Sequence, residues 1–241
     1  MKHGSVCLFF FLFVLSTTFS QDITRFYDPY ATQREVKAFD QLSVSGPIRV
    51  ILKQGTASGV AVSSENASVR DGVQTNVKNG MLFVQFNTGP HLIMKGNANV
   101  IVYVSVKNLD SISLSRASVM VVDGQLKSEK LGIAVSGAST LKAELQLKNL
   151  IIHQSGATDV QLKGSTENIE VRLSGASDLK AFQLFSNNCY AEISGASDMQ
   201  ITVSQKLQAK VSGASDFRYR GNPAVKDVQS NGASLVKRLI D

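Results

Sequence analysis

Apolar and polar residues alternate along most of the chain, and this alternation is interrupted at regular intervals by one short phrase. Leu131, Ile133 and Val135 lead into one copy of the phrase, and Leu141 and Ala143 follow it with polar residues between them. A period of two residues predicts β-strands, because successive side chains of a strand point to opposite faces. No segment between copies has the spacing of an amphipathic helix, so we expect an all-β protein.

The interrupting phrase is Ser-Gly-Ala-Ser or a close variant. Counted from Arg116 in a degenerate first copy, its second residue recurs at steps of 21, 19, 19, 20, 18 and 19. Such a period is typical of stacked repeats, and the frame of leucine-rich repeats is absent. We therefore predict a right-handed parallel β-helix with coils of about 19 residues, clearest over residues 115–235. The expected turn glycines are Gly137, Gly156, Gly175, Gly195, Gly213 and Gly232.

Each residue type of the phrase suits a sharp corner. Glycine allows a positive φ, and serine hydrogen-bonds to nearby backbone or to the next serine along the stack. We expect the alanine to lie where opposite walls approach each other. The polar spacers 146–149, 163–168, 186–188 and 204–206 have the composition of turns.

The N-terminal residues predict export and not fold. Residues 1–20 have a basic start, an apolar run and a small polar end, which is typical of a secretory signal peptide cleaved after Ser20. The apolar run is too short to favour a membrane anchor. We assign residues 21–38 to a linker and residues 39–241 to one β-helical domain. Residues 39–114 should supply the first coils, opening at 42–52, and one cover of the stack; residues 236–240 should supply the other.

Three sequence features together resemble a known family. They are Phe39-x-x-Leu42-x-Val44-Ser45-Gly46, then Val50-x-Leu52-x-Gln54-Gly55, then the reiterated Ser-Gly-Ala-Ser. This arrangement resembles the bacterial "putative auto-transporter adhesin, head GIN domain" family, common in the Bacteroidetes. The resemblance implies a right-handed β-helical fold, placement in the envelope or outside the cell, and an adhesive role. It implies no catalytic residues and no cofactor.

Composition narrows the classes of partner and chemistry. The net charge of +6 is spread along the chain without a basic block, so we do not expect a nucleic-acid surface. The two cysteines cannot build a multi-cysteine metal site, and Cys189 shares a column with apolar residues, which predicts a buried thiol. His153 should point outward and His91 should lie in a loop, so neither a catalytic triad nor a histidine metal site is expected. Gln154 is a polar residue at an inward position with no assigned role.

Two clusters are candidate ligand sites. One is a column of aspartates at a single repeat position, which could bind a cation such as Ca²⁺ or act as an acid pair on a glycan; we favour solvated turn capping, relieved by Lys180 and Arg218. The other is the segment 217–220, which could offer aromatic rings and charge to a sugar or form a solvated edge. The aspartates are Asp159, Asp178, Asp198 and Asp216.

The leading functional hypothesis is an exported, non-enzymatic binding or adhesion module of the bacterial cell envelope, located in the periplasm, on the outer-membrane surface or outside the cell. Its ligand, a glycan or a cell-surface protein, would meet flat strand faces or the loops around residues 89–99. A polysaccharide-active enzyme is the alternative, by analogy with other β-helices, and a purely structural envelope protein is the third hypothesis.

Overall fold

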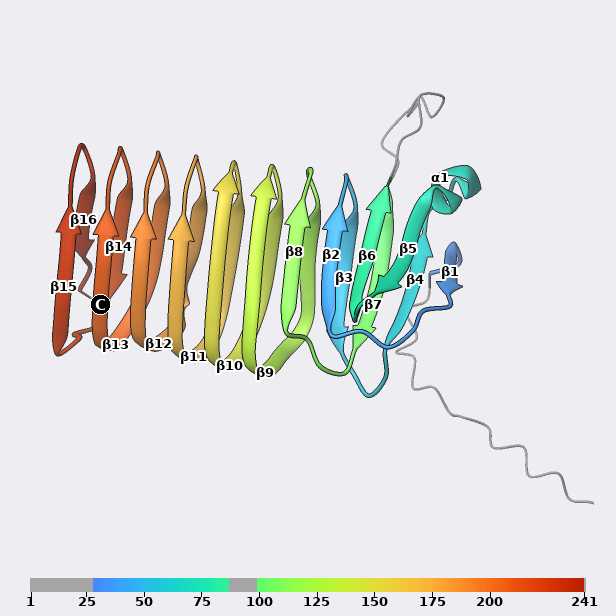
Figure 1. Cartoon of the computed structure of the whole chain (residues 1–241), viewed down its shortest axis with the longest axis horizontal. Coiled ribbons are helices and arrows are strands. Elements are labelled where there is room, and N and C mark those ends of the chain that lie inside the picture. The colour runs from blue at the N-terminus through green and yellow to red at the C-terminus, as the bar shows by residue number, and fades with distance from the viewer. Residues whose placement is uncertain (1–27, 87–98, 241) are drawn as a thin grey trace, which may run out of the picture.

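The computed structural model describes residues 28–86 and 99–240, and it is a parallel β-solenoid of about seven turns. The chain rises along the front face, crosses a tight corner and descends behind while it advances toward the C-terminal end, so the solenoid is right-handed (Figure 1). The predicted fold class is confirmed. The elements are β1 (Ala31–Arg34), β2 (Gln41–Ser45), β3 (Arg49–Gln54), β4 (Gly59–Ser63), α1 (Ala67–Asp71), β5 (Val73–Lys78), β6 (Met81–Phe86), β7 (Ile101–Val106), β8 (Ser111–Ser115), β9 (Val119–Gly137), β10 (Thr140–Gly156), β11 (Asp159–Leu173), β12 (Asp178–Ile193), β13 (Asp198–Val211), β14 (Asp216–Arg220), β15 (Val225–Ser230) and β16 (Leu235–Arg238).

Each long strand pairs in parallel with its equivalent in the next coil. In β10 and β11, Leu141 lies opposite Val160 and Leu150 lies opposite Ile169, which preserves the repeat offset. The pairing continues through the polar spacers, because Gln146 lies opposite Ser165. The prediction that these spacers are turns is therefore wrong: all four lie within strands, and from β9 to β12 the ladder continues through them.

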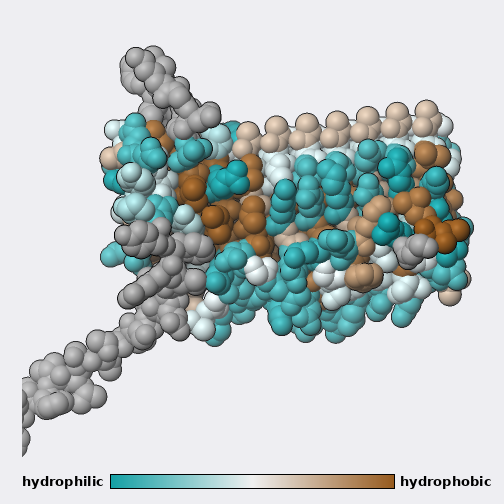
Figure 2. Space-filling model, turned by 180° about the vertical axis from the view of Figure 1, so that it is seen from behind, coloured by the Kyte–Doolittle hydropathy of each residue, from teal (hydrophilic) through white to brown (hydrophobic). Residues whose placement is uncertain are grey.

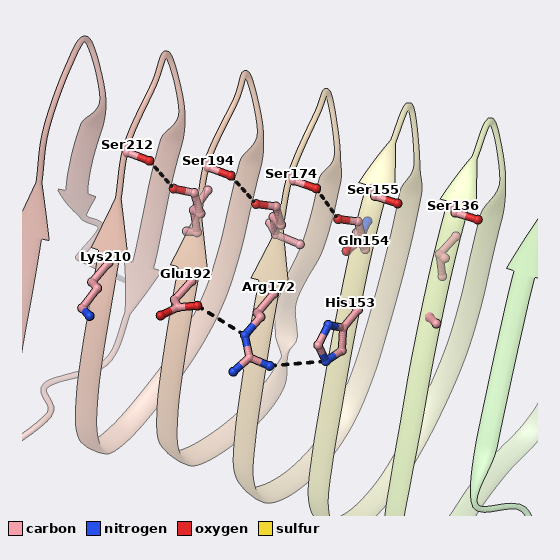
Figure 3. Close-up of a pocket in the computed structure, with 14 residues that line it drawn as sticks. Ser136, His153, Gln154, Ser155, Arg172, Ser174, Glu192, Ser194, Lys210 and Ser212 are labelled. Atoms are coloured by element: carbon pink, nitrogen blue, oxygen red, sulfur yellow. Dashed lines mark hydrogen bonds and ion pairs between the residues drawn. The ribbon is translucent and has the colours of Figure 1, made fainter.

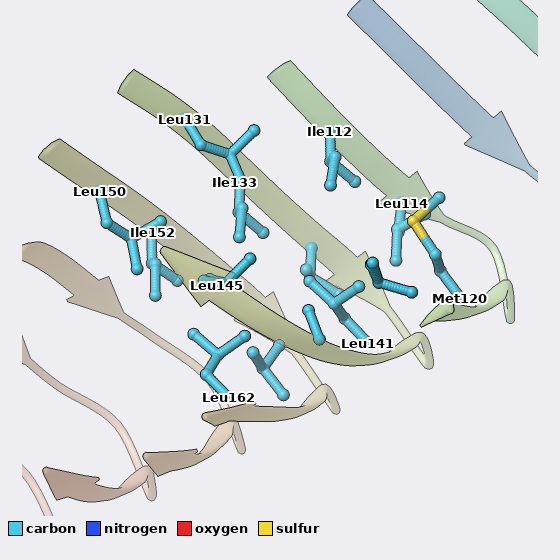
Figure 4. Close-up of a cluster of buried hydrophobic side chains, with 14 of the residues drawn as sticks. Ile112, Leu114, Met120, Leu131, Ile133, Leu141, Leu145, Leu150, Ile152 and Leu162 are labelled. Atoms are coloured by element: carbon cyan, nitrogen blue, oxygen red, sulfur yellow. The ribbon is translucent and has the colours of Figure 1, made fainter. Parts of the chain in front are cut away.

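The core consists of columns of inward side chains stacked from coil to coil (Figure 4). Leu131, Leu150 and Ile169 form one such column, and Cys189 continues it toward the C-terminal end at 3% exposure. Strict alternation places these side chains inside and their polar neighbours outside. Burial raises the pKa of the Cys189 thiol to about 12, as expected for a thiol among hydrocarbon side chains.

The six corner glycines all have positive φ, between 71° and 86°. Arg116 adopts the same region, with φ of 57°, so the first copy bends in a similar way without glycine. The alanine that follows each corner glycine does not lie between opposite walls, as was expected from the sequence. Ala138 and its equivalents are exposed along one edge, whereas the serine or threonine that follows, such as Ser139, is buried in every coil before the last.

That buried hydroxyl mainly binds the corner backbone. Ser197 Oγ, for example, donates to the Ser194 carbonyl at 2.9 Å, whereas the hydroxyl-to-hydroxyl bond expected along the stack occurs between Ser118 and Ser139 at 3.3 Å. The buried position suits serine because its hydroxyl proton has a carbonyl acceptor there.

The N-terminal coils do not stack in chain order. β2 pairs with both β6 and β8, and β3 pairs with both β7 and β9. The coil that opens the domain in sequence therefore lies between the coil of β6 and β7 and the body of the solenoid (Figure 1). Beyond the coil of β6 and β7, three antiparallel strands cover this end of the solenoid: β4 pairs with β7, β5 pairs with β6, and β1 pairs with β4. Residues 31–34, assigned to the linker from sequence, form β1 of this cover.

The C-terminal end finishes on an ordinary coil. β15 pairs with β13, and β16 pairs with β14. Residues 236–240, expected as a cover, begin within β16, and Ile240 is 91% exposed. Lys226 and Arg238 occupy positions opposite Leu207 and Tyr219 of the previous coil. Inward charged residues on a terminal coil oppose edge-to-edge association of β-sheets.

Several predictions concern residues outside the described ranges. These include the signal peptide 1–20, the start of the linker, His91 and nearly all of the loop around 89–99. Within the described ranges, no helix has the length and apolarity needed to cross a membrane.

Candidate functional site

The solenoid has two long faces, which we name by their position relative to the glycine corner. The pre-corner face carries the strand segments that lead into the corner, and the post-corner face carries the segments that leave it. A shallow groove crosses β9 to β13 on each face. The grooves run across the strands, so equivalent residues of successive coils line them.

The serine groove lies on the pre-corner face between two rows of outward residues (Figure 3). One row consists of corner serines, of which four donate a hydroxyl bond to the preceding coil: Ser174 Oγ, for example, donates to the Gln154 carbonyl at 3.3 Å, and Ser194 Oγ donates to the Leu173 carbonyl at 3.2 Å. The protons of these hydroxyls are engaged, and their oxygens can still accept hydrogen bonds. The rows are Ser136, Ser155, Ser174, Ser194 and Ser212, and Ala134, His153, Arg172, Glu192 and Lys210.

The charged row of the serine groove is paired internally. The Arg172 guanidinium lies 2.6 Å from Glu170 and 3.3 Å from Glu192, and its Nη1 is 3.5 Å from His153 Nε2. The hydrogen bond from the Tyr190 hydroxyl lowers the pKa of Glu192. A general acid needs the opposite shift, so this carboxylate is suited to pairing and not to proton donation.

We name the groove on the post-corner face the aromatic groove. Three of its four charged lining side chains are in ion pairs: Lys163 lies 2.7 Å from Glu144, and Lys180 lies 3.3 Å from Asp159 and 2.8 Å from Asp178. Figure 2 shows this face as a mixture of hydrophilic and hydrophobic side chains. The lining residues are Val121, Val122, Gly124, Lys142, Ala143, Glu144, Gln161, Leu162, Lys163, Lys180, Phe182, Gln183 and Gln200.

A bulge in β12 interrupts the aromatic groove. Ala181 lies opposite Ile201 and Phe185 lies opposite Thr202, so three residues of β12 have no partner in β13. The bulge turns both Phe182 and Gln183 outward and buries Leu184. The Arg220 guanidinium carbon lies 4.5 Å from the centre of the Phe182 ring, the geometry of a cation–π contact.

The predicted aspartate column is present as a row in register. Asp159, Asp178, Asp198 and Asp216 lie opposite one another along β11 to β14. Lys180 bridges the first two, Asp178 raises the pKa of this lysine, and Arg218 pairs with Asp216. Across residues 28–86 and 99–240, no group of three or more His, Cys, Asp or Glu side chains is arranged to hold a metal ion. Lys180 and Arg218 make the ion pairs expected of them, and turn capping by the aspartates stays a prediction.

The segment 217–220 does not present aromatic rings to solvent. Phe217 and Tyr219 are buried and pack against each other with ring centres 5.8 Å apart. Their positions in the alternating pattern already implied this. Arg220 of this segment instead lies over the ring of Phe182, and the sequence analysis did not predict this contact. A signal was available, because the coil containing Phe182 is one residue longer than the common period, and the next coil is shorter.

The other two residues considered in the sequence analysis, Gln154 and His153, lie where the alternating pattern places them. Gln154 is buried, and its Nε2 donates to Thr158 Oγ1 at 2.9 Å and to the Asp178 carbonyl at 3.2 Å. Its Oε1 is buried without a hydrogen-bond partner. His153 is exposed in the serine groove, as its position in the pattern predicts.

The fold and the grooves define a right-handed β-solenoid whose long faces are open to solvent. The family model "Putative auto-transporter adhesin, head GIN domain" matches residues 38–223, and the chain belongs to this family. The match covers the N-terminal coils together with the repeats, in agreement with the resemblance found in the sequence. Comparison with curated proteins gives no match.

Several solved structures share the fold. A "putative adhesin" from Bacteroides fragilis NCTC 9343 superposes with a TM-score of 0.80 at 19% identity, covering 87% of this chain and 96% of that one. A "putative lipid binding protein" from Parabacteroides distasonis ATCC 8503 has a TM-score of 0.66 at 16% identity, covering 89% and 98%. A "putative adhesin" from Parabacteroides merdae ATCC 43184 has a TM-score of 0.66 at 16% identity, covering 87% and 95%. At these identities, the similarity concerns the fold.

Proposed function

We propose that this protein is an exported, non-enzymatic binding module of the bacterial cell envelope that attaches to surface molecules through its long faces. The observation that supports this proposal is the pair of grooves that cross successive coils on opposite faces. Their charged side chains neutralise one another, as in Lys163 with Glu144 and Arg172 with Glu192, and do not form an isolated acid and base. Such surfaces provide many weak, repeated contacts, which suits attachment to an extended ligand.

Export and location are part of this proposal. Residues 1–20 have the composition of a secretory signal peptide, and the family description indicates an extracellular or cell-surface protein. The binding module would then act in the periplasm, on the outer-membrane surface or outside the cell. Its partner would be a glycan or a cell-surface protein.

The test combines binding with turnover. The purified protein is applied to a glycan array and to fixed bacterial and host cells, and the bound glycans are then analysed for cleavage by mass spectrometry. Binding without change in the glycans supports the proposal. Cleavage would favour the polysaccharide-active alternative, and absence of binding to both arrays and cells would favour a purely structural role.

A further inference from the structure

Phe185 is an exposed aromatic residue beside the aromatic groove, two residues beyond the lining residue Gln183, and packing does not explain its exposure. Its residue is 63% exposed, whereas the other exposed large hydrophobic residues of the described ranges lie at the two ends of the solenoid. Those end residues border the unpaired sides of terminal coils. Phe185 lies in the body of the stack, opposite Ser165 of one neighbouring coil and Thr202 of the other.

The bulge is what places Phe185 outside. Ala181 is buried, so uninterrupted alternation would also turn Phe185 inward. The bulge reverses this phase, buries Leu184 and leaves the phenyl ring in solvent. Bulges occur where a strand must redirect a side chain, often beside functional sites.

Hydrogen bonds from the next coil hold this irregular backbone. Thr202 Oγ1 donates to the Phe182 carbonyl at 2.8 Å, and Ser186 Oγ donates to the Thr202 carbonyl at 2.9 Å. Arg220 lies over the Phe182 ring and limits its movement. The bulge is therefore a fixed element that presents two phenylalanines on the post-corner face.

The surroundings of these rings are polar but locally neutralised. Gln161, Gln183 and Gln200 line the groove with amide donors and acceptors, and the Lys163–Glu144 and Lys180–Asp178 pairs balance their own charges. This combination suits a ligand that has apolar C–H faces and many hydroxyl groups. A strongly anionic polymer would have to compete with Glu144 and Asp178 for the lysines that these carboxylates already pair.

We infer that the aromatic groove binds a neutral hexose polymer, with hydroxyls bonded to the glutamine amides of the groove and a sugar ring stacked on Phe185 at its border. The groove crosses β9 to β13, which are spaced about 4.8 Å apart, so it offers equivalent contacts over roughly 20 Å to a repeating chain. This inference rests on the proposed binding function and assigns the site and ligand class to it.

The experiment is affinity electrophoresis of the purified protein in gels that contain dextran, a soluble β-1,3-glucan or a yeast mannan, with chondroitin sulfate as the anionic polymer. At least one neutral polymer should retard the protein. Phe185→Ala should weaken that retardation about tenfold, because the stacking contact is lost, and Phe185→Trp should preserve it. Leu235→Ala, which removes an exposed hydrophobic side chain of the terminal coil that lines neither groove, is the matched control and should bind as the unmodified protein does.

Thermal melting separates binding from folding, since replacing an exposed side chain should leave the melting temperature unchanged. Equal retardation of the Phe185→Ala variant, retardation by chondroitin sulfate alone, or no retardation by any neutral polymer would overturn the inference. Attachment to cells that survives in Phe185→Ala would overturn this site while leaving the proposed binding function intact. If the unmodified protein does not attach to cells, both this site and the proposed binding function are overturned.

Discussion

Replacing Gly195 by alanine tests whether the corner glycines are needed for stacking as well as for their backbone conformation. Gly195 has φ of 81°, and a Cβ built there would lie 2.5 Å from the carbonyl oxygen of Gly175 in the preceding coil. That oxygen accepts the Ala196 N–H at 2.8 Å, so the methyl group would disturb a hydrogen bond of the corner ladder. The glycine therefore meets two separate constraints.

The magnitude follows from these constraints. A non-glycine residue at positive φ costs about 1–2 kcal/mol. Crowding of a packed site adds about 1–3 kcal/mol, and a weakened hydrogen bond adds about 1 kcal/mol. We expect Gly195→Ala to lower the free energy of unfolding by about 3–6 kcal/mol, which corresponds to a fall of about 10–20 °C in melting temperature for a domain of this size.

Gly124→Ala is the matched control, because Gly124 has φ of 85° but a Cβ there would meet no atom within 4 Å. It should cost only the conformational part, about 1–2 kcal/mol. Urea unfolding followed by circular dichroism, together with thermal melting, measures both variants. Equal losses in the two variants would refute the argument that stacking, and not φ alone, requires glycine at the corner.

Three further predictions concern buried or partly buried polar groups. Since folding raises the pKa of Cys189 from 9.0 to about 12, the unfolded chain loses this proton first, so the thiol's contribution to stability is present below pH 9 and is lost between pH 9 and about 12. A thiol reagent at pH 8 should leave Cys189 unlabelled in the folded protein and label it in denaturant; labelling of Cys189 in the folded protein, located by peptide mass spectrometry, would contradict the burial. Burial and the Asp28 carboxylate raise the pKa of Tyr103 to about 12, and an ultraviolet titration should show this value fall in Asp28→Asn but not in Asp227→Asn. Gln154→Leu should stabilise the protein by about 1 kcal/mol in urea unfolding, because it removes a buried acceptor without a partner from an otherwise apolar column; a loss of stability would show that the bond to Thr158 matters more.

The candidate site shows where pattern analysis was sufficient and where it stopped. Alternation correctly placed Cys189 inside and His153 outside, and the same rule implied the burial of Phe217. It could not place Phe185, because the bulge reverses the phase from Leu184 to Ser186, and a second irregularity between Ser186 and Asn188 restores it before Cys189. The length of that coil signalled an irregularity but not its position.

The sequence by itself determined the coil and its corner. A period near 19 residues, two-residue alternation and a recurrent glycine are local properties, and each directly constrains backbone conformation or the buried face. They were enough for the fold class, the stacked register of the repeats and the family.

Only the tertiary structure decided the order of the N-terminal coils and the construction of the aromatic groove. The position of β2 between β6 and β8 depends on which strand edges are free when distant segments meet. The contact of Arg220 with Phe182 likewise spans an intervening strand. Such arrangements follow from competition among non-local contacts, and several pairings of similar strands satisfy the same local pattern.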